Sequence, residues 1–167
     1  MDNVNLLHGF SAGNVWAQSP QTGSVDMGGT VRGVLGAGYR LSDPSEARSF
    51  VPEGTFIGLE ALGQATSWYG GTDYLLGGKL VLGQNNINFG VIAGYQHGPV
   101  DEGAYTMGAE LNFNPVLPLM LIPGVGYYGL VYEALLRPMV LSVQVRGDSE
   151  RGLPDSLRGG VSLGWGF

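Results

Sequence analysis

The chain has 167 residues, which fits a single domain, and 30 of them are glycine while only 13% are charged. The absence of cysteine excludes disulfides, thiolate metal sites and a cysteine nucleophile. The hydrophobic fraction of 44% excludes a disordered chain, and eight basic residues against a net charge of −6 exclude a basic nucleic-acid-binding surface.

Apolar residues alternate with small or polar residues at a period of two, which predicts β-strands with two unlike faces. The eight predicted strands are, in chain order, residues 24–42, 54–66, 73–83, 86–96, 104–114, 119–129, 134–146 and 156–167. Segment 119–129 is apolar on both faces and is the least regular of them. The connections are rich in Gly, Pro, Asn and Asp and leave no room for crossover helices, so we expect neighbouring strands to pair as antiparallel hairpins.

Charged residues avoid one face of these strands. Only Arg137 is charged on the apolar face, whereas the opposite face carries Asp26, Arg32, Arg40, Glu60, Lys79, Glu110, Arg146 and Arg158. In a soluble barrel the Gly, Ser and Thr face would meet water, although soluble surfaces are usually far richer in charge. In a membrane barrel the apolar face meets lipid and the polar face lines a narrow interior. The sequence therefore predicts an all-β, antiparallel, up-and-down transmembrane barrel of eight strands.

Aromatic residues gather near the ends of the predicted strands, where the two interfacial girdles of a membrane barrel lie. The girdle candidates are Tyr95, Tyr105, Phe113, Tyr127, Trp165 and Phe167. With its terminal "GWGF", residues 24–167 resemble the small eight-stranded outer-membrane barrels of Gram-negative bacteria, such as the OmpA transmembrane domain and OmpX. The resemblance implies a location in the bacterial outer membrane and a C-terminal strand that the barrel assembly machinery recognises.

The inward face holds the candidate site, a network of charged residues in the barrel interior. An eight-stranded barrel is just wide enough for side chains to fill, and an isolated charge inside it would be costly, so opposite charges should pair. We expect a plugged barrel with ion pairs near Glu60, Lys79, Glu110 and Arg158. Arg32 and Arg146 complete the predicted network, and a structural interior is favoured over an ion pathway.

Residues 1–23 stand apart from the predicted barrel of residues 24–167. They are a periplasmic tail, a plug, an additional strand in a ten-stranded barrel, or an arm that docks on a partner. Leu6, Leu7, Phe10, Val15 and Trp16 make the segment too apolar for an inert tail. We favour a docked segment.

Acidic residues dominate the predicted loops, so most of the charge on the protein surface is expected in these loops. If both termini are periplasmic, residues 42–53 and 147–156 reach the outer surface on the same side. Acidic loops in that position would either bridge to lipopolysaccharide phosphates through divalent cations or remain solvated tips. We expect outer-membrane lipids, lipopolysaccharide and an envelope protein as partners, and no resident cofactor or metal.

Few residues offer catalytic chemistry. His97, with Asp101 or Glu102 to orient it, and Ser67 or Ser142 as nucleophile would resemble a lipid A-modifying enzyme, but the predicted topology places His97 at a periplasmic turn. "GVGYYG" at residues 124–129 matches a dinucleotide motif without the helix that such a site needs. The predicted role is structural, adhesive or scaffolding, as a subunit of a larger envelope complex. A narrow channel for small solutes or apolar ligands is the alternative, and an enzyme the least favoured.

Overall fold

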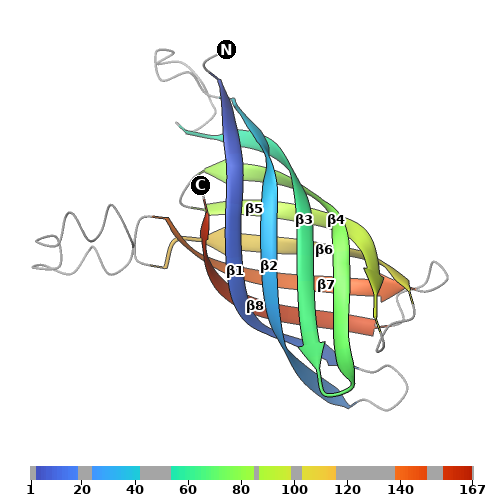
Figure 1. Ribbon diagram of the computed structural model, residues 1–167. Helices are drawn as coiled ribbons and strands as arrows, with labels where there is room; N and C mark the ends of the chain where they lie inside the picture. The colour runs from blue at the N-terminus through green and yellow to red at the C-terminus, as the bar shows by residue number, and fades with distance from the viewer. Residues whose placement is uncertain are drawn as a thin grey trace, which may run out of the picture.

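The computed structural model describes residues 3–18, 24–41, 54–84, 87–98, 103–115, 138–149 and 156–166. These residues form one closed antiparallel β-barrel (Figure 1). Its strands are β1 (Val4–Gln18), β2 (Val25–Arg40), β3 (Phe56–Trp68), β4 (Gly71–Gln84), β5 (Ile87–His97), β6 (Ala104–Phe113), β7 (Met139–Ser149) and β8 (Ser156–Gly166). Each strand pairs with its sequence neighbours, and β8 pairs with β1 to close the barrel. The predicted fold class is confirmed.

The N-terminal segment is a barrel strand, which corrects our expectation of a docked arm outside the barrel. Val4–Gln18 forms β1, which pairs with β2 along its whole length and with β8 from Gly9 onward. The segment escaped recognition because both of its faces mix polar and apolar residues. Its inner face includes Leu7 and Val15, whereas its outer face includes Asn14. The predicted strand at residues 119–129 lies outside the described residues.

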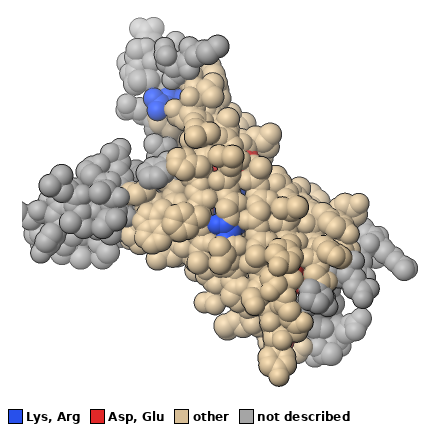
Figure 2. Space-filling view, viewed as in Figure 1, with Lys and Arg blue, Asp and Glu red and all other residues tan. Residues whose placement is uncertain are grey.

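The barrel is inside-out relative to a soluble protein. Among the described residues, 19 buried side chains are polar or charged and nine are hydrophobic. Large apolar side chains point outward instead, for example Met27, Leu59 and Leu76, which are 71%, 66% and 72% exposed. Figure 2 shows few charged side chains on the face over β1 to β4, with one patch of Lys or Arg atoms near its middle. This outer face is suited to lipid and not to water.

The two ends of the barrel differ, and the strand directions define them. We call the end where β1 begins and β8 finishes the terminal end, and the opposite one the far end. Residues 42–53 connect strand ends at the terminal end, whereas residues 150–155 connect strand ends at the far end. The expectation that these two acidic loops share one side of the membrane is therefore wrong, because five barrel strands, β3 to β7, lie between them, whereas the prediction placed six there.

Glycines allow β1 and β8 to approach closely at the seam that closes the barrel. A Cβ atom built on Gly13 would lie 2.1 Å from the backbone oxygen of Val161, and one built on Gly164 would lie 2.1 Å from that of Phe10. Atoms at such distances overlap, so a larger residue at either position would push the strands apart. These glycines are therefore required where the barrel closes.

Candidate functional site

All six charged residues of the predicted network lie in the barrel interior. Arg32, Glu60, Lys79, Glu110, Arg146 and Arg158 are between 1% and 8% exposed. Each comes from a different strand, and their side chains point inward because they occupy the inner positions of the alternation. The structure brings four of them together and places the other two farther along the barrel.

The first group, which we call the central cluster, consists of Arg32, Glu60, Lys79 and Glu110. The two terminal nitrogens of Arg32 bind the two carboxylate oxygens of Glu110, with Nη2 at 2.7 Å from Oε1. Lys79 Nζ lies 2.7 Å from Glu60 Oε2 and 3.2 Å from Glu110 Oε1. Since β2 and β6 are not neighbours, the ion pair of Arg32 and Glu110 crosses the interior. The cluster combines two basic with two acidic side chains.

A second group, the far-end cluster, contains Arg158 with Asp73 and Asp148, two acidic residues that the predicted network did not include. Arg158 Nη1 lies 3.7 Å from Asp73 Oδ2, and its Nε contacts Asp148. The guanidinium also lies 5.2 Å from the ring centroid of Trp68, in cation–π geometry. Arg158 therefore does not join Glu60, Lys79 and Glu110. Asp73 lies an even number of residues from Lys79, and Asp148 lies an even number from Arg146, so each pair points to the same face of its strand. This spacing is the sequence signal that would have placed both carboxylates inside.

An apolar layer separates the two clusters. Leu62, Leu75 and Ile92 pack together in the interior, with Val34 against them. On the inner face of β4, Leu75 lies between Lys79 of the central cluster and Asp73 of the far-end cluster. Between the two charged clusters the interior is therefore apolar on the side formed by β2 to β5.

Arg146 occupies the same middle region and has a different environment. The residue is 1% exposed, and none of its three guanidinium nitrogens has a hydrogen-bond partner among the described residues. Gln64, Thr106 and Gln144 are also buried, and each carries a side-chain oxygen without a partner in the described part of the chain. Buried groups of this kind are normally satisfied by ordered water.

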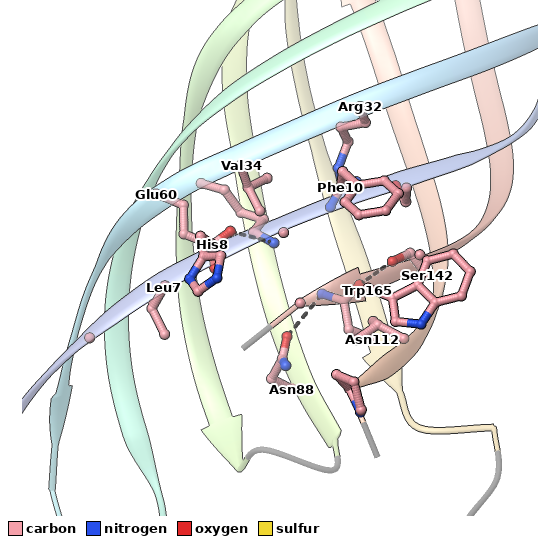
Figure 3. A pocket seen from close by; sticks show the side chains of 18 of the residues that line it. Leu7, His8, Phe10, Arg32, Val34, Glu60, Asn88, Asn112, Ser142 and Trp165 are labelled. Carbon is pink, nitrogen blue, oxygen red and sulfur yellow. Dashed lines mark hydrogen bonds and ion pairs between the residues drawn. The ribbon is translucent and has the colours of Figure 1, made fainter. Parts of the chain in front are cut away.

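A cavity of about 720 Å³ opens above the central cluster at the terminal end. Arg32, Glu60 and Lys79 contribute to its floor. One wall is polar, since Asn112 Nδ2 donates to Asn88 Oδ1 at 2.9 Å and Ser142 donates to Asn112 (Figure 3). Leu7, Val34 and Phe56 contribute apolar surface. The cavity therefore has a charged floor and walls of mixed character.

The described girdle candidates fall at both ends of the barrel. At the far end Tyr95 and Tyr105 are exposed on the outer face and contact each other edge to face, with centroids 5.5 Å apart. At the terminal end Trp165 stacks on Phe10 at 5.6 Å, and Phe113 ends β6 at the same end. Phe10 was not among the candidates because its strand was not recognised. Tyr127 and Phe167 lie outside the described residues.

The residues considered for catalysis are not assembled into a site. His97 is exposed at the far end of β5, so its predicted position at a terminal-end turn is wrong. Ser67 is exposed on the outer face of β3, whereas Ser142 is buried in the interior beside Asn112. Asp101 and Glu102 lie outside the described residues. Within the described ranges no group of three or more His, Cys, Asp or Glu could hold a metal ion, and no helix is long and apolar enough to cross a membrane.

Comparisons with known proteins find the fold but no sequence relative. No protein-family model matches the chain, and no curated protein matches it in sequence. The crystal structure of Neisserial surface protein A (NspA) is similar over 99% of this chain and 98% of that one, with 13% identity and a TM-score of 0.53. Ail, the attachment invasion locus protein of Yersinia pestis, solved with the heparin analogue sucrose octasulfate, is 13% identical over 98% of this chain and 99% of that one, with a TM-score of 0.45. The chain has the fold of the small eight-stranded outer-membrane barrels, and its apolar outer face fits a position in the outer membrane.

Proposed function

We propose that the chain is a closed, non-enzymatic barrel of the bacterial outer membrane with a structural or scaffolding role. The observation that carries this proposal is the layered interior, in which the ion pair of Arg32 and Glu110 spans the space between non-adjacent strands. Lys79 links that pair to Glu60, so side chains from four strands meet in one layer. A barrel filled in this way anchors a protein in the membrane without conducting solutes.

The apolar layer strengthens the case for a closed interior. Leu62 and Leu75 are 3% and 2% exposed, and Ile92 is fully buried. A hydrated ion that passed the central cluster would have to displace these packed apolar side chains or the buried side chain of Arg146 in the same region, at a cost of several kcal/mol. The cavity at the terminal end therefore has a closed floor.

The far-end connections that flank the described strands are short, for example two residues between Trp68 and Gly71. Short turns leave the barrel wall as the largest surface near this end for contact with lipids, lipopolysaccharide or an envelope protein. We further propose that β8, whose outer face carries Val161, Leu163 and Trp165, is the strand that the assembly machinery recognises.

Conductance tests this proposal. The protein is refolded in detergent and added to a planar lipid bilayer beside a detergent blank. We expect the wild type to show no stepwise conductance above the blank. A variant with Leu62→Gly and Ile92→Gly, which removes most of the apolar layer, provides the comparison for an opened interior. Stable conductance steps from the folded wild-type protein would show a channel and contradict the proposal.

A second candidate function is favoured by the cavity at the terminal end. Its volume of about 720 Å³ lies within the range of small-molecule sites, roughly 300 to 1,000 Å³. The hydrogen-bonded side chains of Asn88, Asn112 and Ser142 would orient a polar ligand, and Leu7 with Phe56 would contact its apolar part. Ligand-dependent quenching of Trp165, which borders the cavity, would reveal such binding, provided that Asn112→Leu abolishes it.

A further inference from the structure

The cavity at the terminal end lies beside a gap in the barrel wall between β1 and β8. β8 pairs with β1 only from Gly9 onward, whereas β2 pairs with β1 already from Val4. Arg40 N donates to the backbone oxygen of Asn3, so odd-numbered residues of β1 direct their backbone groups toward β2. The even-numbered Val4 and Leu6 therefore direct theirs toward the side of β8, where no described residue lies opposite them. This free stretch of the β1 edge is the gap.

Side chains from both faces of β1 line the cavity. The inward residues Leu7 and Ser11 contribute to it, and so do the outward residues Leu6 and Phe10. An intact wall would separate these two sets, because successive side chains of a strand point to opposite faces of the sheet. Figure 3 shows Leu7 on β1 at one side of the cavity and Asn112 at the other. The cavity therefore opens sideways through the gap.

The gap lies at the level of the aromatic residues of the terminal end. Phe10 stacks on Trp165 at 5.6 Å next to the point where the pairing of β1 with β8 ends, and both side chains line the cavity. Aromatic rings in such positions mark the interface between hydrocarbon and head groups. An open sheet edge is excluded from hydrocarbon, whereas water satisfies its backbone groups at the interface. Molecules with a polar head and an apolar chain gather at this level, so the gap faces them.

The floor of the cavity presents more positive than negative charge. Arg32, Lys79 and Glu60 line it, whereas Glu110 is not among the lining residues. Lys79 Nζ contacts one oxygen of each glutamate, at 2.7 and 3.2 Å, and an ammonium group carries three donors, so at least one donor remains for a ligand. Arg146 in the same region has no hydrogen-bond partner among the described residues and adds a further positive charge. An anionic group therefore fits this floor.

The walls of the cavity suit a molecule that is polar at one end and apolar along the rest. Leu7 and Phe56 belong to a buried apolar cluster, and both line the cavity. On the side of β5 to β7, a hydrogen-bonded row of polar side chains lines it, formed by Asn88, Asn112 and Ser142. The polar row and the charged floor would bind a head group, and the apolar side would contact a hydrocarbon chain that leaves through the gap.

We propose that the cavity binds a single-chain carboxylate, such as a fatty acid, which enters from the membrane through the gap between β1 and β8. The carboxylate lies at the floor beside Lys79, and the chain contacts Leu7 and Phe56 on its way to the gap. This proposal rests on the ligand site described above as the second candidate function, and it names the ligand class and the route of entry.

Protection of a thiol in the cavity tests the ligand class, since the chain contains no cysteine. Val140→Cys places a single thiol in the cavity, and His97→Cys, exposed at the far end, is the matched control. Each variant is refolded into phosphatidylcholine vesicles and alkylated with N-ethylmaleimide in the presence of decanoate, decanol or decylamine at equal mole fraction. At about ten times its dissociation constant, decanoate should slow alkylation of Val140→Cys about tenfold by mass action and leave His97→Cys unchanged. Decanol and decylamine should protect less.

The outcomes separate this proposal from the second candidate function on which it rests. If none of the three compounds protects Val140→Cys, the cavity is not a site for such ligands, and both the function and the proposal fail. If decanol or decylamine protects as well as decanoate, the cavity is a ligand site, but its assignment to carboxylates is overturned.

A second variant and a longer chain test the floor and the gap separately. In the Val140→Cys background, Lys79→Gln should reduce protection by decanoate to the level of decanol, and gel mobility before and after boiling shows whether the variant is folded. An unchanged preference for decanoate would overturn the placement of the carboxylate. Hexadecanoate should protect the unmodified floor at least as well as decanoate, because its chain extends through the gap into the membrane. Loss of protection with the longer chain would show that the cavity is closed at its side and overturn the route of entry.

Discussion

Arg32 on β2 and Glu110 on β6 form a two-point ion pair across the interior of the barrel, although their strands are not neighbours. Both side chains are almost fully buried, at 7% and 1% exposed. The pair therefore connects opposite walls of the barrel directly. The stability of the barrel and the closure of its interior depend on this ion pair and on the side chains around it.

Removing one partner of this pair should destabilise the barrel more than removing both. Glu110→Ala leaves Arg32 without its carboxylate and Lys79 with only Glu60, so we expect a loss of about 3 to 5 kcal/mol in the free energy of unfolding. The double variant Arg32→Met with Glu110→Leu replaces the pair by apolar groups and should recover much of that loss. Urea unfolding in lipid vesicles measures both. A double variant less stable than Glu110→Ala would contradict the assignment.

The two charged clusters should behave independently. Glu60→Gln acts on the central cluster and Asp73→Asn on the far-end cluster, and Leu62 and Leu75 lie between these two carboxylates on the wall of β3 and β4. Their effects on the free energy of unfolding should therefore add to within about 0.5 kcal/mol in a double variant. Strong non-additivity would show that the far-end cluster and the central cluster form one network.

Closure of the barrel should depend on glycine at the seam of β1 and β8. Gly164→Ala places a Cβ atom against the backbone oxygen of Phe10 and should cost roughly 3 kcal/mol or prevent formation of the compact barrel. Gly33→Ala is the matched control, since a Cβ atom there meets nothing within 4 Å. Gel mobility of unboiled samples after refolding distinguishes the two. If both variants folded equally well, the close approach at the seam would not be required.

A charge on the outer wall should be costly in proportion to its depth. Val91 lies on the outer face of β5 between Phe89 and Tyr95, whereas His97 lies beyond Tyr95 at the far end. Val91→Arg should lower the free energy of unfolding in vesicles by about 2 to 4 kcal/mol, and His97→Arg by about 0 to 1 kcal/mol. Equal effects at the two positions would indicate that this wall does not face hydrocarbon.

Alternation was sufficient to predict the barrel class because lipid and interior demand opposite residue types along most strands. On β5, for instance, outward Phe89 and Val91 alternate with inward Asn88 and Gly90. On β1 the contrast is lost, since Leu7 points inward and Asn14 outward, and the strand was missed. Omitting β1 then reversed the side assigned to His97, and predicting six strands between the two acidic loops placed both loops wrongly on one side.

The sequence predicts which residues face the interior better than it predicts which of those residues pair with each other. Parity indicates that Arg158 and Lys79 point inward, but which carboxylate each one meets depends on the register and tilt of every strand between them. Arg158 meets Asp73 because the start of β8 lies at the same end of the barrel as the start of β4. Such a relationship follows from the complete topology and not from local pattern.

The central claim is that the apolar wall faces lipid and the charged side chains face inward. Gel mobility of boiled and unboiled samples, after refolding with and without detergent, tests it most directly. The account predicts a compact β-rich species that forms only with detergent and changes mobility on boiling. A compact β-rich protein that forms in water alone, with no change on boiling, would contradict it, because the exposed side chains of Met27, Leu59 and Leu76 would then require a different fold.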